Sequence, residues 1–347
     1  MPTIPEQIEA IEKEIRETPY HKGTERHIGM LRARFAKLKD ALDRPSGKSG
    51  GGGGYAVKKQ GDATIVLVGP PSAGKSTLLN ALTNAESKVA PYAFTTVSVI
   101  PGMMKYNDAY IQILDVPGLI EGAEEGKGRG REVLSVARGA DLLILISDVS
   151  RPEAIKRNIA ALERNGIRIN KYPPEVKIEK KLKGGLLIKS NIKQDLDRET
   201  VKEVAAEMGV KNAEIQIRQQ VSLDELIDIF AKNRVYVPAI SVLNKADTLP
   251  AIPTKVGIYT ISAETGLGLE ELKRIIWDKL NLVKIYLIDK PMIVKAGISL
   301  KDVAELIGTD FAATHTSAKI WGESAKFPGQ EVSLNKKVSE GMKVRFI

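Results

Sequence analysis

The segment from Gly69 to Ser76 has the residue types and spacing of a loop that holds phosphate groups. Its sequence, GPPSAGKS, matches the pattern G-x-x-x-x-G-K-[ST]. In this pattern backbone N–H groups surround phosphate oxygens, the lysine reaches the β- and γ-phosphates, and the final hydroxyl binds Mg²⁺. A chance glycine turn is disfavoured, because a strand-like run precedes the loop and a helical pattern follows it. The predicted phosphate-binding residues are Gly69, Pro70, Pro71, Ser72, Ala73, Gly74, Lys75, Ser76 and Thr77.

Two segments downstream have residues suited to sensing a γ-phosphate and a metal ion. A carboxylate at the end of a strand, as at Asp115, can hold Mg²⁺ through water, and the Gly118 N–H can face the γ-phosphate. A threonine hydroxyl between the two motifs can close over Mg²⁺ while GTP is bound. Without the phosphate loop, a turn and an edge strand would be the favoured readings. The candidates are Phe94, Thr95 and Thr96 in the first segment and Asp115, Val116, Pro117, Gly118 and Leu119 in the second.

A third set of residues is suited to recognising guanine. In Asn244-Lys245-Ala246-Asp247, the Asp247 carboxylate can accept hydrogen bonds from guanine N1 and N2, and Asn244 can recognise the O6 edge. Adenine offers no such donors, so the wrong base would leave a polar group unpaired. Ser262-Ala263-Glu264 can complete the base pocket through the Ala263 backbone N–H. The order of the motifs predicts that the chain binds GTP and GDP.

No side chain identifies itself as the group that orients the attacking water. Leu119 occupies the place where Ras-like enzymes have a glutamine, and a leucine cannot do this work. Lys127, Arg129 and Arg131 can stabilise transition-state charge, although solvated residues of a mobile second switch are the favoured reading. The catalytic side chain is therefore unknown, and we expect slow intrinsic hydrolysis.

The composition of the chain narrows the classes of function. The 347 residues, 43% hydrophobic and 27% charged, are typical of globular protein with two or three domains. The absence of cysteine excludes a disulfide framework and a thiolate zinc site. Apolar runs are too short to span a bilayer and no secretory signal is recognisable, so we expect a cytoplasmic location and no membrane partner. The net charge of +9 favours a polyanionic partner but also fits an ordinary basic protein.

The elements that must position these residues can be read from periodicity. Apolar spacing predicts two N-terminal helices, and the second has a basic face that is either solvated or in contact with RNA. Strands are predicted at Ala63–Val68, Ala109–Leu114, Asp141–Ser147, Tyr236–Leu243 and Val256–Ile261. The 87 residues between Ser147 and Val235 exceed a βαβ crossover, so a subdomain must be inserted there. The tail from Lys284 reads as short strands around one helix, Leu300–Ile307.

These motifs, together with longer phrases of the sequence, resemble the developmentally regulated GTP-binding (DRG) family, an Obg-like branch of the P-loop GTPases. The phrases include Ile11 to Thr18, Tyr92 to Thr96, Gly166 to Pro174 and Asn233 to Pro238. The resemblance implies an α/β Ras-like P-loop G domain, an N-terminal helical hairpin, an inserted S5D2-like α+β subdomain and a C-terminal β-grasp (TGS) domain. The implied boundaries are 1–45 for the hairpin, 46–60 for a glycine-rich linker, 61–164 with 234–283 for the G domain, 165–233 for the insert and 284–347 for TGS.

The resemblance also implies ligands, partners and a role. It assigns Mg²⁺ to Ser76 and Thr96, and guanine to Asn244 and Asp247. The motifs themselves add Asp115 through water as a metal ligand, and Lys245, Ser262, Ala263 and Glu264 as residues of the guanine site. K⁺ is a second candidate ion, because some relatives with a hydrophobic residue at the Leu119 position use it; the matching ligand position is Ser72, so modest stimulation is expected. The implied role is a ribosome-associated translation switch that contacts the ribosome or rRNA and has a regulatory partner protein in eukaryotic relatives. The alternatives are an Obg-type ribosome-assembly GTPase and an RNA-binding scaffold with structural GTP.

Overall fold

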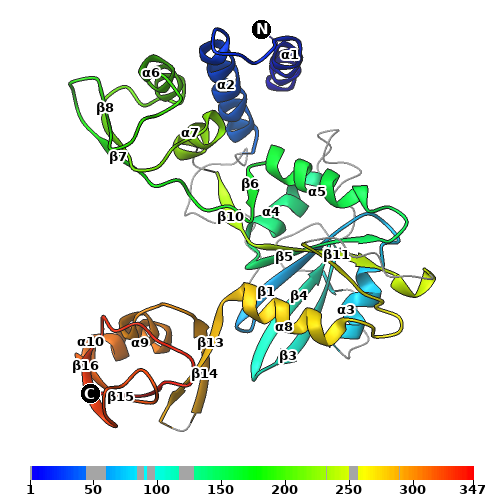
Figure 1. The fold of residues 1–347 in the computed structure, drawn as a ribbon, viewed down its shortest axis with the longest axis vertical. Helices are drawn as coiled ribbons and strands as arrows, with labels where there is room; N and C mark the ends of the chain where they lie inside the picture. Colours follow the sequence, from blue (N-terminus) through cyan, green and yellow to red (C-terminus); the bar gives the residue numbers. More distant parts are fainter. Residues whose placement is uncertain are drawn as a thin grey trace. The chain divides into compact units, whose positions relative to one another are not determined.

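The computed structural model describes residues 2–43, 60–83, 90–91, 98–116, 129–231, 233–249, 257–288 and 290–347. These residues form two compact units, coloured along the sequence in Figure 1. Unit 1 is formed within Met1–Gly52 and Glu163–Tyr236, and unit 2 within Gly53–Leu162 and Val237–Ile347. Among the described residues, no helix combines the length and apolar character that crossing a bilayer requires.

Seven described strands of unit 2 form one sheet in the order β12-β11-β5-β1-β4-β3-β2. The first five of these are parallel, whereas β3 runs antiparallel to β4 and β2 antiparallel to β3. The strands are β1 (Ala63–Val68), β2 (Ala90–Pro91), β3 (Ser98–Tyr106), β4 (Ala109–Asp115), β5 (Leu142–Asp148), β11 (Ala239–Asn244) and β12 (Ile258–Thr260). The predicted α/β class is therefore confirmed.

Helices cover both faces of this sheet, as Figure 1 shows. They are α3 (Lys75–Thr83), α4 (Arg129–Arg138), α5 (Glu153–Arg164) and α8 (Leu269–Leu280). Ile65 and Ile113 belong to one core with Leu78 of α3 and Leu272 of α8. Successive side chains of a strand point to opposite faces, and the next residue along β1, Val66, is also fully buried. Burial on both faces explains why these strands read as continuous apolar runs.

The structure corrects one sequence prediction in this domain and shows one strand that was not predicted. The predicted strand Tyr236–Leu243 is two strands, β10 (Val235–Val237) and β11, separated by Pro238. Proline has no N–H to donate, so the ladder is interrupted there, and β10 pairs with β6 (Ile167–Ile169) of the insert. The long strand β3 was not predicted, because Pro101 and Gly102 break its alternating pattern.

The C-terminal residues form a separate five-stranded mixed sheet in the order β14-β13-β17-β15-β16. Its elements are β13 (Leu282–Leu287), β14 (Lys290–Lys295), α9 (Leu300–Ile307), α10 (Thr309–Thr314), β15 (Ser317–Trp321), β16 (Gln330–Ser333) and β17 (Lys343–Phe346). The prediction of a single helix was wrong, since α10 follows α9 after Gly308. Helix α10 is too short to show apolar periodicity; Phe311 fixes it by edge contact with Phe346, at 5.3 Å between ring centroids.

Unit 1 joins the N-terminal hairpin and the insert in one hydrophobic core. Its elements are α1 (Ile4–Glu17), α2 (Glu25–Asp43), β6, β7 (Val176–Lys180), β8 (Leu186–Ser190), α6 (Arg198–Glu207), β9 (Ala213–Ile217), α7 (Leu223–Phe230) and β10. Strands β7, β9 and β8 form a three-stranded sheet. Ile28 and Ala33 of α2 share a core with Val204 of α6 and Leu226 of α7. Segments more than 150 residues apart in the sequence thus fold together.

The basic face of α2 is engaged by the insert. Arg26 pairs with Glu203 of α6, and Arg32 lies 2.9 Å from Asp224 of α7. The Lys37 ammonium donates to the Glu207 carbonyl at 3.0 Å. Neither of the two readings of this face, a solvated surface or an RNA contact, anticipated these intramolecular pairs.

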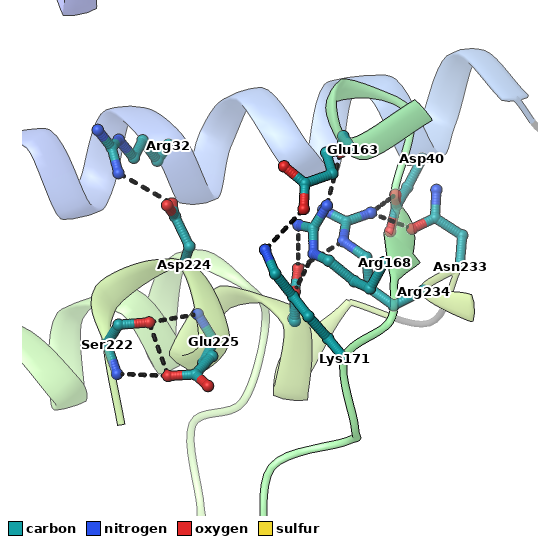
Figure 2. A network of polar contacts seen from close by, with 11 residues as sticks. Arg32, Asp40, Glu163, Arg168, Lys171, Ser222, Asp224, Glu225, Asn233 and Arg234 are labelled. Atoms are coloured by element: carbon teal, nitrogen blue, oxygen red, sulfur yellow. Dashed lines mark hydrogen bonds and ion pairs between the residues drawn. The ribbon is translucent and has the colours of Figure 1, made fainter. Parts of the chain in front are cut away.

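The buried carboxylate of Asp228 lies at the centre of a polar network in unit 1, and Figure 2 shows Arg168, Arg234 and Asp40 of this network. Asp228 of α7 accepts from Arg168 of β6 at 2.6 Å and from Arg234, which directly precedes β10, at 2.7 Å. The Asp228 side chain is 3% exposed, and those of Arg168 and Arg234 are 14% and 11% exposed. Arg168 also donates to the Glu163 carbonyl at 2.6 Å, while Arg234 lies 3.7 Å from Asp40 of α2. The network links the segments by which the chain enters and leaves the insert.

We predict that Asp228→Asn lowers the local stability of unit 1 by about 3 kcal/mol, because it removes the charge that compensates two mostly buried guanidinium groups. Native-state hydrogen exchange of the α7 amides measures this. The control is Asp224→Asn, which removes an exposed pair with Arg32 and should cost at most about 1 kcal/mol. Equal losses in the two variants would contradict the assignment.

Candidate functional site

The predicted phosphate loop connects the end of β1 to the first residue of α3. A Cβ atom on Gly69 would lie 2.2 Å from the Ile146 carbonyl oxygen of β5, so the loop can pass this strand only with glycine. Gly74 has φ +86°, and its Cβ would lie 2.2 Å from the Asn244 amide nitrogen. The buried Lys75 ammonium donates to the carbonyl oxygens of Gly69 and Pro70, at 3.1 and 3.0 Å. The sequence motif therefore folds as a tight loop with the lysine beneath it.

The structure brings Ser76 and Asp115 together, as a metal site requires. The parallel register of β1 and β4 places Asp115 opposite Leu67, next to the loop. The Ser76 hydroxyl donates to Asp115 Oδ2 at 2.6 Å. The carboxylate is buried, and within the described part of the chain its Oδ1 has no hydrogen-bond partner. A hydroxyl beside an orphaned carboxylate oxygen is a donor set that suits Mg²⁺, which prefers hard oxygen ligands.

Asn244 ends β11 and connects the phosphate loop to the predicted base-binding loop. Its amide nitrogen donates to the Ala73 carbonyl at 3.0 Å, and its amide oxygen accepts from the Ala263 N–H at 2.9 Å. The Asn244 side chain and the Ala263 N–H, which were assigned to guanine recognition from the sequence, are thus hydrogen-bonded to each other in this structure. Their contact with guanine stays a prediction, while their role in joining three loops is visible.

Asp247 lies in the short 3₁₀ helix Ala246–Thr248 and is exposed. The Ser262 hydroxyl donates to its Oδ1, which orients the carboxylate. Lys245 adopts φ +66°, a left-handed conformation that turns the chain between β11 and this helix. Glu264 is exposed and forms no part of the core. The structure thus places an oriented carboxylate beside the loop that begins at Ser262.

Several predicted site residues lie outside the described residues. They are Phe94, Thr95 and Thr96 of the first switch and Pro117, Gly118 and Leu119 of the second. Their assignments remain predictions. Asp115 and the buried Val116 are described, as are all the predicted phosphate-loop residues.

Sequence reasoning missed two residues of this site, Asp148 and Arg151. Asp148 is the last residue of β5, opposite Asn244 in the parallel register. Arg151 donates to the Pro71 carbonyl of the phosphate loop at 3.1 Å. A signal was present in the sequence, because ligands bind at the carboxyl ends of parallel strands, where a charged residue at the end of an apolar strand stands out.

Three family models match consecutive parts of the chain. Residues 64–180 match the MMR_HSR1 model, which is described as a 50S ribosome-binding GTPase. Residues 183–282 match the C-terminal region of that same domain, and residues 283–347 match a TGS domain. The last match agrees with the separate C-terminal sheet.

Relatives match along nearly the whole chain. A GTP-binding protein of Methanocaldococcus jannaschii is 43% identical, over 97% of this chain and 91% of the relative. Developmentally-regulated GTP-binding protein 1 of Xenopus laevis is 41% identical over 94% of each chain. Ribosome-interacting GTPase 1 of Saccharomyces cerevisiae is 40% identical over 96% of each chain.

We predict that Gly74→Ala weakens guanine-nucleotide binding about 100-fold, because the added methyl group strains the left-handed backbone and displaces the Asn244 amide. Titration calorimetry with GDP measures the loss. Gly209→Ala is the control: its φ is +84°, but a Cβ there meets nothing within 4 Å. The control should lose stability and keep its GDP affinity. A Gly74→Ala protein with parental affinity would show that the loops need not pack this closely.

Proposed function

Because this chain belongs to the developmentally-regulated GTP-binding protein family of P-loop GTPases, we propose that it hydrolyses GTP to GDP and phosphate as a ribosome-associated translation switch. The observation that carries hydrolysis is the pairing of Ser76 with the buried Asp115 next to the phosphate loop. Mg²⁺-dependent binding of GTP and its hydrolysis both use such a pair, so the pair supports an intact rather than a degenerate site. Phosphate release is the measurement that separates hydrolysis from a scaffold that holds GTP only as a structural ligand.

Each residue of the site has a role in this proposal. Lys75 and the loop N–H groups would bind the β- and γ-phosphates, and Ser76, Asp115 and Thr96 are the residues that would hold Mg²⁺, Asp115 through water. Bound there, Mg²⁺ would neutralise negative charge on the transferring phosphate. Asp247, oriented by Ser262, accepts from guanine.

A leucine at position 119 cannot orient water, so the proposed intrinsic rate is low and needs a stimulus. We propose that the ribosome supplies it and that K⁺ contributes modestly through Ser72. Multiple-turnover phosphate release, with K⁺ exchanged for Na⁺ and with ribosomes present or absent, measures each contribution. A chain that binds GTP and releases no phosphate under any of these conditions would leave the structural-GTP reading.

Ribosome association is supported by the description of the matching family model and by the name of the yeast relative. The net charge of +9 suits a polyanionic partner. We expect this chain to sediment with ribosomes more strongly with a GTP analogue than with GDP, and less as salt rises. The comparison includes a chain lacking residues 283–347, which form their own core. Sedimentation independent of nucleotide would contradict a switch.

We predict that Asp247→Asn reverses base preference, lowering affinity for GTP and raising it for xanthosine triphosphate about 100-fold, because an amide can donate to the extra carbonyl of xanthine. Competition against a fluorescent guanine nucleotide measures both affinities. The matched control is Asp278→Asn, an exposed carboxylate on α8. If Asp247→Asn preferred GTP as strongly as the parent, the base-pocket assignment would be wrong.

A further inference from the structure

Arg151 connects the loop after β5 to the phosphate loop. Its Nη2 donates to the Pro71 carbonyl at 3.1 Å, and its Nε donates to Asp148 Oδ2 at 2.9 Å. Pro71 and Ser72 lie at the middle of the loop, between Gly69 and Gly74. The contact therefore reaches the part of the loop where the backbone turns.

The Pro71 carbonyl belongs to the same peptide unit as the Ser72 N–H. In a trans peptide these groups point in opposite directions. A guanidinium that holds the Pro71 carbonyl therefore also fixes the direction of the Ser72 N–H, which points the opposite way. Ser72 has φ +61°, a left-handed conformation that a residue with a side chain adopts at a cost. The contact from Arg151 to the Pro71 carbonyl therefore lies directly beside the strained residue of the turn.

Asp148 fixes the guanidinium. Its side chain is 6% exposed, and it accepts from the Ser150 N–H at 3.1 Å as well as from Arg151. Burial raises the pKa of Asp148, but hydrogen bonds from Arg151 and Ser150 outweigh this and leave the pKa lowered, so the carboxylate stays charged. An ionised, buried acceptor holds the arginine more tightly than an exposed ion pair would.

Asn244 makes the equivalent contact two peptides further along. Its side-chain amide donates to the Ala73 carbonyl, and its backbone carbonyl accepts from the Val149 N–H at 3.0 Å. The carbonyls of residues 71 and 73, on either side of Ser72, are therefore both held by groups at the ends of β5 and β11. This arrangement leaves the N–H groups of residues 72 and 74 directed away from those carbonyls.

We propose that Arg151, anchored by Asp148, is a positioning residue that holds the Pro71–Ser72 peptide in the orientation that donates the Ser72 N–H to a nucleotide phosphate. Arg151 acts through the loop and need not touch the nucleotide. The inference rests on residues 69–76 being the phosphate loop. It predicts an effect confined to ligands that carry phosphate.

The test compares Arg151→Ala with the parent for GTP, GDP and guanosine, by competition against a fluorescent guanine nucleotide. We expect the Kd for GTP and GDP to rise roughly tenfold, the effect of one hydrogen bond from a charged donor, and the Kd for guanosine to stay within about twofold. Arg151→Lys keeps one donor and should recover part of the loss. Arg157→Ala, an exposed arginine of α5, is the matched control and should behave as the parent.

Two outcomes would overturn the proposal: a GDP affinity within about twofold of the parent, or a guanosine affinity that falls by the same factor as GDP, which indicates a general disturbance of the site. Lys75→Ala, measured in parallel, separates this proposal from its premise. If Lys75→Ala left GDP binding unchanged, the phosphate-loop assignment itself would fail. If Lys75→Ala weakened GDP binding and Arg151→Ala left it unchanged, the phosphate-loop assignment would be kept and Arg151 would have no positioning role.

Discussion

The carboxyl edge of one parallel sheet holds the candidate nucleotide site together, and the Asn244 side chain is the contact on which its loops depend. Four neighbouring strands end there, and the register puts Asp115 beside Leu67 and Asn244 beside Asp148. Backbone loops that leave a sheet edge are free to diverge. Asn244 prevents this by joining Ala73 to Ala263, so the phosphate loop and the base loop keep a fixed separation. A cradle built in advance lowers the entropy lost on binding.

Charge is used differently in the two units. In unit 2, Asp115 and Asp148 are buried at the sheet edge, one beside a hydroxyl and the other beside an arginine that reaches the phosphate loop. In unit 1, Asp228 is neutralised inside the fold by Arg168 and Arg234, and the basic face of α2 is matched to acidic residues of the insert. Several of the arginines of unit 1 therefore already have intramolecular partners.

Predictions from the sequence agree with the structure where the signal is local, and they fail where an element depends on residues distant in the sequence. The helix Leu300–Ile307 has the predicted bounds, because apolar spacing along one helix is a local signal. Strand β3 and helix α10 were missed, because their stability comes from pairing with β4 and from Phe346, which local spacing cannot reveal. Pro238 is an intermediate case. The sequence shows that this residue lacks an N–H donor, but it does not show that β10 pairs with β6.

By itself the sequence determined the GTPase family, the order of the site motifs along the chain and the chemistry of each motif. It could do so because a short motif carries its own backbone geometry and its own hydrogen-bond donors. Tertiary structure decided which of these residues meet. It placed Ser76 against Asp115, turned both ends of Asn244 toward other loops, and brought Arg151 to Pro71 across 80 residues of sequence. It also merged the N-terminal hairpin with the insert into one core. Such contacts depend on strand register and on burial between distant segments, and no local pattern encodes either of them.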